Sequence, residues 1–126
     1  MKTNSDGDIH MKIYLAAPYS HSNPSIRQGR FLAANQAAAK LIGMGHVVFS
    51  PISHSHPIAN CMGNNLSKVW LEQDRHFVDW ADCMVILDLD PPGHEASKGI
   101  QQEIRWMREA SKQIFLFSEF TQGKGG

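Results

Sequence analysis

The run from Cys83 to Leu89 constrains the fold of this sequence more than any other feature, because Asp88 is its one polar residue. A strand with one face in water alternates apolar and polar residues. A parallel strand that is covered by helices on both faces reads as a nearly continuous apolar run. The run therefore predicts a buried strand over 83–89, in a chain of the α/β class.

The rest of the chain alternates between strand-like and helix-like segments. Short apolar runs predict further strands over 12–17, 46–50 and 113–117. Longer amphipathic or alanine-rich segments predict helices over 25–44, 66–80 and from Ser97 to about Ser111. Right-handed crossovers arrange such a chain as a doubly wound, flavodoxin-like sheet of four or five parallel strands.

Length and charge indicate a single domain with a small-molecule partner. A chain of 126 residues can bury a core without disulfides or metals. Its 12 basic and 12 acidic side chains cancel, and no Lys/Arg cluster marks a nucleic-acid binder. No stretch approaches the ~18 apolar residues of a membrane span. We expect a domain over 12–118, a loose N-terminal extension over 1–11 and a flexible tail over 119–126, with neither nucleic acid nor membrane as a partner.

The two cysteines predict a reducing compartment. Cys61 and Cys83 have no CxxC spacing, and Cys83 lies in the predicted buried strand, where a free thiol is usual. This pattern fits a cytoplasmic protein.

The segment that follows the buried strand carries the first candidate site. Ser97 begins a predicted helix, Gly99 lies in its first turn, and Glu103 lies about one turn further on. Ligands of open α/β sheets bind outside the carboxyl ends of the strands, where a helix N-terminus offers free N–H groups. The same residues also fit a plain helix start, with Ser97 as its N-cap and Glu103 favoured by the helix dipole.

Three more residues have both a chemical and a structural interpretation. Asp74 lies on the helix before the buried strand, where the pattern alone favours a solvated face. Tyr14, in the first strand, is typical of core packing. Arg27 follows the first strand and fits either an anion site or a surface loop. The expected inward stripe of the helix over 66–80 consists of Val69, Trp70, Phe77 and Trp80.

The segment 52–65 predicts a loop, because it holds Pro57, several His and Asn residues and little periodicity. We expect this loop to act as a lid over the carboxyl edge of the sheet. His54 and His56 alternate in an extended stretch, so only one can face the site, and we expect His56 to line its mouth. A zinc site needs a third and a fourth ligand. No neighbouring residue in the sequence clearly supplies them, so we expect no metal. A metal-dependent hydrolase built on the two histidines is a further alternative.

Several stretches, in their order and spacing, resemble a known group of proteins. They are residues 13–20 (IYLAAPYS), 45–52 (GHVVFSPI) and 97–103 (SKGIQQE), together with Asp74 ahead of Ala81-Asp82. Over 12–118 the chain looks like an uncharacterised family of small domains related to the nucleoside 2-deoxyribosyltransferases. The wider superfamily includes nucleotide N-glycosidases that cleave nucleoside 5′-monophosphates. The resemblance implies the same fold.

The resemblance also implies roles for the matched residues. Glu103 stands where relatives carry the Glu that attacks the anomeric carbon, Asp74 where an Asp handles the proton of the base, and Tyr14 where a Tyr steadies the nucleophile. Ser97 stands six residues before that Glu, where the monophosphate-cleaving relatives carry a Ser that contacts the phosphate. We expect the substrate-binding set to be completed by Gly99, Ala17, Arg27 and His56.

The chemistry of these residues agrees with the resemblance. Cleavage of a glycosidic bond passes through an oxocarbenium-like state, which one carboxylate can trap while a second group protonates the departing ring. We expect an N-glycosidase or a deoxyribosyltransferase-like enzyme that acts on a nucleoside or nucleoside 5′-monophosphate without a cofactor. Hydrolysis and transfer both stay open.

The alternative function is a non-catalytic nucleotide-binding module that uses the same Ser97/Gly99 region. We also expect a homo-oligomer, because related enzymes complete their pockets with a neighbouring subunit. The apolar side chains available for that contact are Trp70, Phe77, Trp80 and Trp106.

Overall fold

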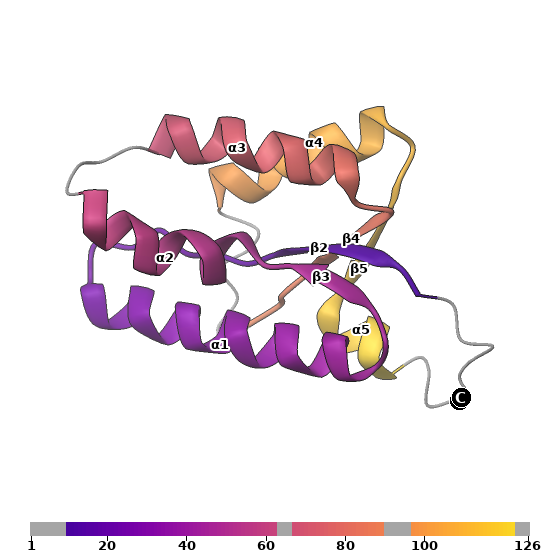
Figure 1. Ribbon diagram of the computed structural model, residues 1–126, viewed down its shortest axis with the longest axis horizontal. Helices are drawn as coiled ribbons and strands as arrows, with labels where there is room; N and C mark the ends of the chain where they lie inside the picture. Colours follow the sequence, from indigo (N-terminus) through magenta and orange to yellow (C-terminus); the bar gives the residue numbers. More distant parts are fainter. Residues whose placement is uncertain (1–9, 63–66, 90–96, 123–126) are drawn as a thin grey trace.

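Parallel strands form the sheet at the centre of the protein (Figure 1). The computed structural model describes residues 10–62, 67–89 and 97–122. Within these ranges the strands are β2 (Lys12–Ala16), β3 (Val47–Phe49), β4 (Cys83–Ile86) and β5 (Gln113–Leu116). Their order across the sheet is β3-β2-β4-β5, and every neighbouring pair is parallel. The predicted α/β class and parallel sheet are confirmed, and the order is consistent with a flavodoxin-like fold.

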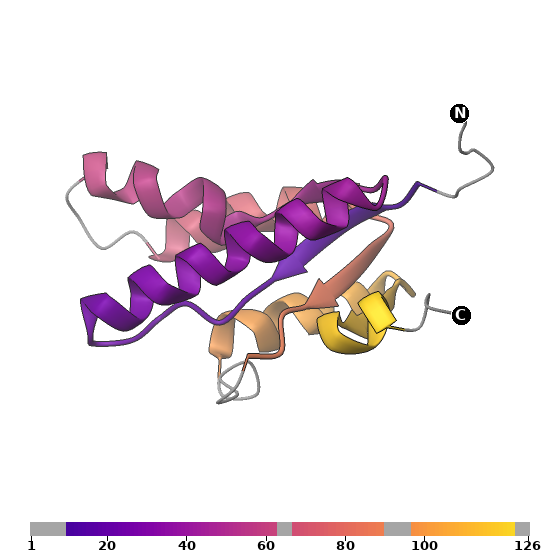
Figure 2. The same ribbon diagram turned by 90° about the horizontal axis from the view of Figure 1, so that it is seen from below.

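Helices cover both faces of this sheet. They are α1 (Pro24–Gly43), α2 (Pro51–Met62), α3 (Ser67–Trp80), α4 (Lys98–Glu109) and α5 (Phe117–Gln122). Helices α3 and α4 lie above the strands in Figure 1, and α1 and α5 lie below them. The view from below shows β2 and β4 running between α1 and α5 (Figure 2). Within the described ranges no helix is long and apolar enough to cross a membrane.

The alternation of side chains along β2 divides the core in two. Ile13 and Leu15 point toward α1, where Ala34, Ala37 and Leu41 pack closely on the sheet. Tyr14 and Ala16 point toward the other face, where they pack with Val78 of α3, with Ala81 just after it, and with Ile100 and Met107 of α4. All four β2 residues from Ile13 to Ala16 are fully buried, as a central strand requires.

Helix α1 begins and ends close to the predicted positions. The Asn23 side chain accepts a hydrogen bond of 2.8 Å from the N–H of Ser25, and Pro24 occupies the first turn, where its missing N–H costs nothing. The helix ends at Gly43 with Met44 as its C-cap, and Gly45 follows with φ +102°, a left-handed conformation that favours glycine.

The predicted loop over 52–65 is wrong for residues up to Met62, which form helix α2. Pro51 stands in the first turn, and the Ser50 hydroxyl interacts with Ser53, so the helix has a regular start. Pro57 lies inside the helix and removes a single backbone hydrogen bond. Contacts between α2 and α1 hold the segment despite this loss.

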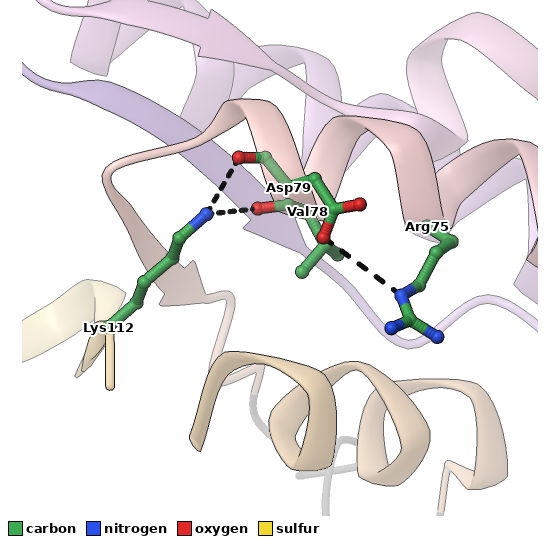
Figure 3. Close-up of polar contacts among 4 residues, drawn as sticks. All are labelled: Arg75, Val78, Asp79 and Lys112. Carbon is green, nitrogen blue, oxygen red and sulfur yellow. Dashed lines mark hydrogen bonds and ion pairs between the residues drawn. The ribbon is translucent and has the colours of Figure 1, made fainter. Parts of the chain in front are cut away.

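Helix α3 buries most of the predicted stripe, because Phe77 and Trp80 pack against the core and Trp70 is half-buried. Val69 is 43% exposed, so its predicted inward position is wrong, and Val78 is fully buried instead. The C-terminal end of α3 is held by Lys112, whose ammonium group donates to the carbonyls of Val78 and Asp79 at 2.8 Å each (Figure 3). On the outer surface, Arg75 forms an exposed ion pair of 4.0 Å with Asp79.

The ends of β4 and β5 also differ from expectation. Strand β4 ends at Ile86 instead of continuing to Leu89, and Phe117 begins helix α5 instead of ending a strand. The Asp88 carboxylate accepts hydrogen bonds from the backbone N–H and the hydroxyl of Ser118, at 3.1 and 2.5 Å, which fixes the first turn of α5. Helix α5 therefore occupies the start of the predicted tail over 119–126. Residues 123–126, and residues 1–9 of the predicted extension, lie outside the described residues.

Candidate functional site

The order in which strands are added to the sheet changes direction between β2 and β4, because β3 lies on one side of β2 and β4 lies on the other. From β2 the chain passes through α1 on one face, and from β4 it passes into α4 on the opposite face. Ligands of open α/β sheets bind at the carboxyl ends of the strands at such a point. The candidate residues from β2, α3 and α4 can therefore meet on the α3/α4 side of this edge.

Tyr14 and Glu103 meet in the core. The Tyr14 hydroxyl, from the centre of β2, donates a hydrogen bond to Oε2 of Glu103 on α4, which agrees with the expectation that Tyr14 steadies Glu103. Tyr14 is fully buried and Glu103 is 6% exposed. A carboxyl this deep is costly unless it is hydrogen-bonded or protonated, so Glu103 does more than favour the start of a helix.

Asp74 completes an acidic group around the same phenol. It lies half-buried on α3, facing inward, so the solvated helical face that its pattern favours is wrong. Its carboxyl interacts with the Tyr14 hydroxyl and with the charge of Glu103. Three elements that are far apart in the sequence thus bring two carboxyls to one hydroxyl.

The buried setting changes the acidity of all three groups. The pKa of Glu103 is raised to about 8, mainly by burial. The hydrogen bond from Tyr14 lowers this pKa, and the charge of Asp74 raises it. Burial raises the pKa of Asp74 to about 7, and the contact with Tyr14 lowers it. Burial, followed by the two neighbouring carboxylates, raises the pKa of Tyr14 well above its ordinary value. Near neutral pH the two carboxyls therefore retain protons that ordinary carboxyls have lost.

Ser97 caps helix α4, as its pattern indicates. Its hydroxyl accepts a hydrogen bond of 3.3 Å from the N–H of Ile100, and its carbonyl accepts one of 3.1 Å from Gln101. Lys98 and Gly99 are exposed in the first turn. The backbone N–H groups of that turn have no acceptor within the helix and carry its positive dipole end.

Two predicted binding residues lie apart from this group. Ala17 follows β2, and its side chain is buried in the core cluster of α1. Arg27 lies on α1, on the opposite face of the sheet from Ser97, and its guanidinium donates to the carbonyl of His21. The structure therefore does not bring Arg27 and Ser97 together.

His56 lies on α2, and its side chain faces α1, where it belongs to a chain of polar contacts. Its Nδ1 is 2.6 Å from the Tyr19 hydroxyl, and its Nε2 is 3.0 Å from Oε1 of Gln28. Because the Gln28 oxygen only accepts, Nε2 carries the proton and Nδ1 accepts from Tyr19. Phe31 stacks on the imidazole at 4.2 Å between ring centroids. The prediction that His54 and His56 lie in an extended lid is wrong, because α2 is a helix.

Sequence reasoning missed a row of aromatic rings beside the acidic group. Phe49 lies 6.1 Å from Tyr14, stacks on Phe77 at 3.7 Å, and lies 5.7 Å from His54, between ring centroids. His54 in turn meets Trp70 edge-on at 6.2 Å. The spacing of Trp70, Asp74 and Phe77, which share one face of a helix, was the available signal.

The described residues contain no cluster of three or more His, Cys, Asp or Glu side chains that could hold a metal ion. The buried group can bind and release protons near neutral pH. It can also present a carboxylate whose orientation is fixed by Tyr14. General acid catalysis and nucleophilic attack need these two properties.

Comparison with known proteins gives a family match without a stated activity. A family model described as a domain of unknown function, DUF1937, matches residues 11–119. No curated protein matches the chain. The matched span includes every residue of the acidic group, the Ser97 cap and the aromatic row.

Proposed function

The chain belongs to the DUF1937 family, and from the chemistry of its site we propose that this member cleaves or transfers at the N-glycosidic bond of a nucleoside or nucleoside 5′-monophosphate. The observation that carries the proposal is the buried hydrogen bond from Tyr14 to Glu103 beside the carboxyl of Asp74. The nucleoside 2-deoxyribosyltransferase-like assignment of the fold is part of the same proposal.

The single proton of the Tyr14 hydroxyl supports a division of roles. Since this proton is donated to Glu103, a second hydrogen bond to the hydroxyl has to reach its oxygen lone pairs. A protonated Asp74 can donate such a bond. We assign the reactive form as a protonated Asp74, a phenol and an ionised Glu103, with Asp74 as the acid and Glu103 as the nucleophile. Since the pKa of Glu103, about 8, lies above that of Asp74, about 7, this form is a minor one in the free protein.

The reaction follows from these roles. Asp74 gives its proton to a ring nitrogen of the base while the C1′–N bond breaks, and Oε1 of Glu103 forms a bond to C1′. The base leaves neutral, and Asp74 is left as a carboxylate. Asp74 then takes a proton from water, or from a second base, as that molecule attacks C1′ and releases Glu103. The first acceptor gives hydrolysis and the second gives transfer.

The N-terminus of α4 supports a phosphate on the substrate. The Ser97 cap, the exposed N–H groups of the first turn and the charge of Lys98 all favour an anion there. This end of α4 lies at the carboxyl edge of the sheet, less than two helical turns from Glu103. We therefore propose a preference for the 5′-monophosphate over the nucleoside.

The test is a panel of ribo- and deoxyribonucleosides and their 5′-monophosphates, with free base measured by chromatography. The proposal expects base release that falls at least ~1,000-fold in Glu103→Gln, which removes the nucleophile at nearly constant shape. Glu109→Gln is the matched control, because Glu109 is exposed on the same helix. For Asp74→Asn the control is Asp79→Asn, whose side chain is 67% exposed on α3.

Each outcome of this test decides something. Full activity of Glu103→Gln excludes covalent attack by this residue. Tight nucleotide binding without base release from any member of the panel favours the non-catalytic binding module instead. A glycosyl adduct on Glu103, detected by the mass of the intact protein, would support the covalent route directly.

A further inference from the structure

One face of α3 carries three side chains in a row, Trp70, Asp74 and Phe77. Spacings of four and three residues place them on neighbouring turns of the same face. Helix α3 begins near the carboxyl edge of the sheet and ends next to the start of β4 (Figure 1). Trp70 therefore lies closer to the carboxyl edge than Asp74 does, and Phe77 lies deeper.

The deeper end of this row is already filled. Phe77 stacks on Phe49 at 3.7 Å with an interplanar angle of 7°, and Phe49 contacts the buried ring of Tyr14. Both phenylalanines pack against the core on this face of the sheet. A planar ligand therefore has no place beside Phe77.

The outer end of the row has a different character. Trp70 is half-buried, and its ring meets that of His54 at 90° and 6.2 Å. His54 comes from α2, is exposed, and contacts Phe49 at 5.7 Å. An indole offers a large flat face, and an imidazole offers one donor and one acceptor nitrogen. These two groups can recognise a flat ring with a polar edge.

We propose that Trp70 and His54 form the seat for the leaving group, and that this leaving group is a nitrogen heteroaromatic base. The base stacks on the indole of Trp70, and His54 hydrogen-bonds to its polar edge. One helical turn, about 6 Å, separates Trp70 from Asp74, so a ring seated on Trp70 has a nitrogen within reach of the Asp74 carboxyl. This inference rests on the proposed function and adds the substrate element that the site recognises.

Binding of free adenine, hypoxanthine and cytosine, measured by isothermal titration calorimetry, tests the seat without turnover. Stacking of a base on an aromatic side chain is worth a factor of about 10 to 100 in affinity, so Trp70→Ala weakens binding by that factor and Trp70→Phe by less. His54→Ala changes the order of affinity among the three bases. Ribose 5-phosphate, which lacks a base, binds Trp70→Ala and the unchanged protein equally.

Trp106→Phe and His76→Ala are the matched controls. Both residues line a separate surface depression between α3 and α4, where Trp106 packs under the guanidinium of Arg75 at 4.8 Å. These variants keep the base affinities of the unchanged protein. If Trp70→Ala does not fold, His54→Ala still decides the matter, because His54 is exposed.

Unchanged base affinities in both Trp70→Ala and His54→Ala would overturn the seat, and so would the absence of base binding to the unchanged protein. Base release from nucleosides separates this failure from failure of the proposed function. If the Trp70→Ala and His54→Ala variants release base from nucleosides as fast as the unchanged protein does, the proposed function is supported and the base seat is wrong. Base binding that depends on Trp70, without release from any nucleoside, leaves the seat standing without the enzyme.

Discussion

The hydroxyl of Tyr14 and the carboxyl of Glu103 join the central strand of the sheet to helix α4 through a hydrogen bond in the core. The two residues are 89 positions apart in the sequence. Asp74 adds a second carboxyl from α3.

The pH dependence of base release follows from the acidic pair. The reaction needs a protonated Asp74 and an ionised Glu103. Because the pKa of Asp74 is raised to about 7 and that of Glu103 to about 8, this is the less common of the two singly ionised forms of the pair, and both forms are most populated between pH 7 and 8. We expect a bell-shaped profile of kcat/KM with its maximum in that window. A profile that is flat from pH 5 to 9 would contradict the assignment.

Tyr14→Phe should move this profile to higher pH. The phenol stabilises the ionised form of Glu103 and lowers its pKa, so losing the hydrogen bond raises that pKa. We expect kcat to fall about 10- to 100-fold at neutral pH and to recover partly at alkaline pH. Tyr19→Phe serves as a control, since Tyr19 contacts His56 instead of the acidic pair. A shift toward lower pH would refute this role of Tyr14.

Glu103→Gln should make the protein more stable at alkaline pH. The folded-state pKa of Glu103 lies above its unfolded value, so the folded protein binds more protons. The stability contribution of this group is present below the unfolded pKa of roughly 4.3 and is lost as pH rises through about 8. An amide carries no such penalty, so we expect the variant to gain about 2–4 kcal/mol relative to the natural protein at pH 9, and much less at pH 5.

Urea unfolding at the two pH values measures this difference. Glu109→Gln should show no such dependence, because Glu109 is exposed. An equal effect of Glu103→Gln at pH 5 and pH 9 would show that the carboxyl does not carry a raised pKa in the folded protein.

Substitutions of Ser97 should separate its capping role from its contact with phosphate. Asp and Asn are both good N-caps, so Ser97→Asp and Ser97→Asn should keep the stability of α4 to within about 0.5 kcal/mol. Ser97→Asp places a negative charge at the proposed phosphate position and should reverse the preference for the 5′-monophosphate over the nucleoside. Ser97→Asn should retain it. The ratio of the two kcat/KM values is the measurement, and an unchanged ratio in Ser97→Asp would remove phosphate recognition from this turn.

Lys112→Met should destabilise the protein by about 1–2 kcal/mol. Its ammonium group donates to two carbonyls at the C-terminal end of α3, where a positive charge also complements the helix dipole (Figure 3). Asp79→Ala breaks the exposed pair with Arg75 and should cost less than about 0.5 kcal/mol. Chemical denaturation of the two variants gives the comparison, and equal effects would show that the Lys112 contacts add nothing.

The sequence predicted the sheet well because β2 and β4 are covered on both faces. Such strands leave a continuous apolar pattern that depends little on the rest of the fold. The pairing of Tyr14 with Glu103 was expected from the resemblance, in which a Tyr of the first strand steadies the Glu, whereas the pattern of the strand by itself indicated only core packing.

The errors came from segments whose structure depends on tertiary contacts. Helix α2 contains Pro57 and two histidines, a composition typical of a loop. Tertiary contacts such as the stacking of His56 on Phe31 are not visible in the sequence pattern. Asp74 is an acidic residue, and periodicity cannot distinguish a solvated carboxyl from one that is turned toward a phenol. Helix α5 is short, and its first turn is held by the side chain of Asp88, which follows strand β4.

The position of Tyr14 in the central strand has a consequence for motion. β2 is paired on both sides, with β3 and with β4, so its backbone opens only when the whole sheet unfolds. Helices α3 and α4 lie on the outside and can open locally. The amide hydrogens of Ile13 to Ala16 should therefore exchange with deuterium last. The phenol is then a fixed point against which the two carboxyls adjust, so any rearrangement during a reaction belongs to the helices and leaves the strand in place.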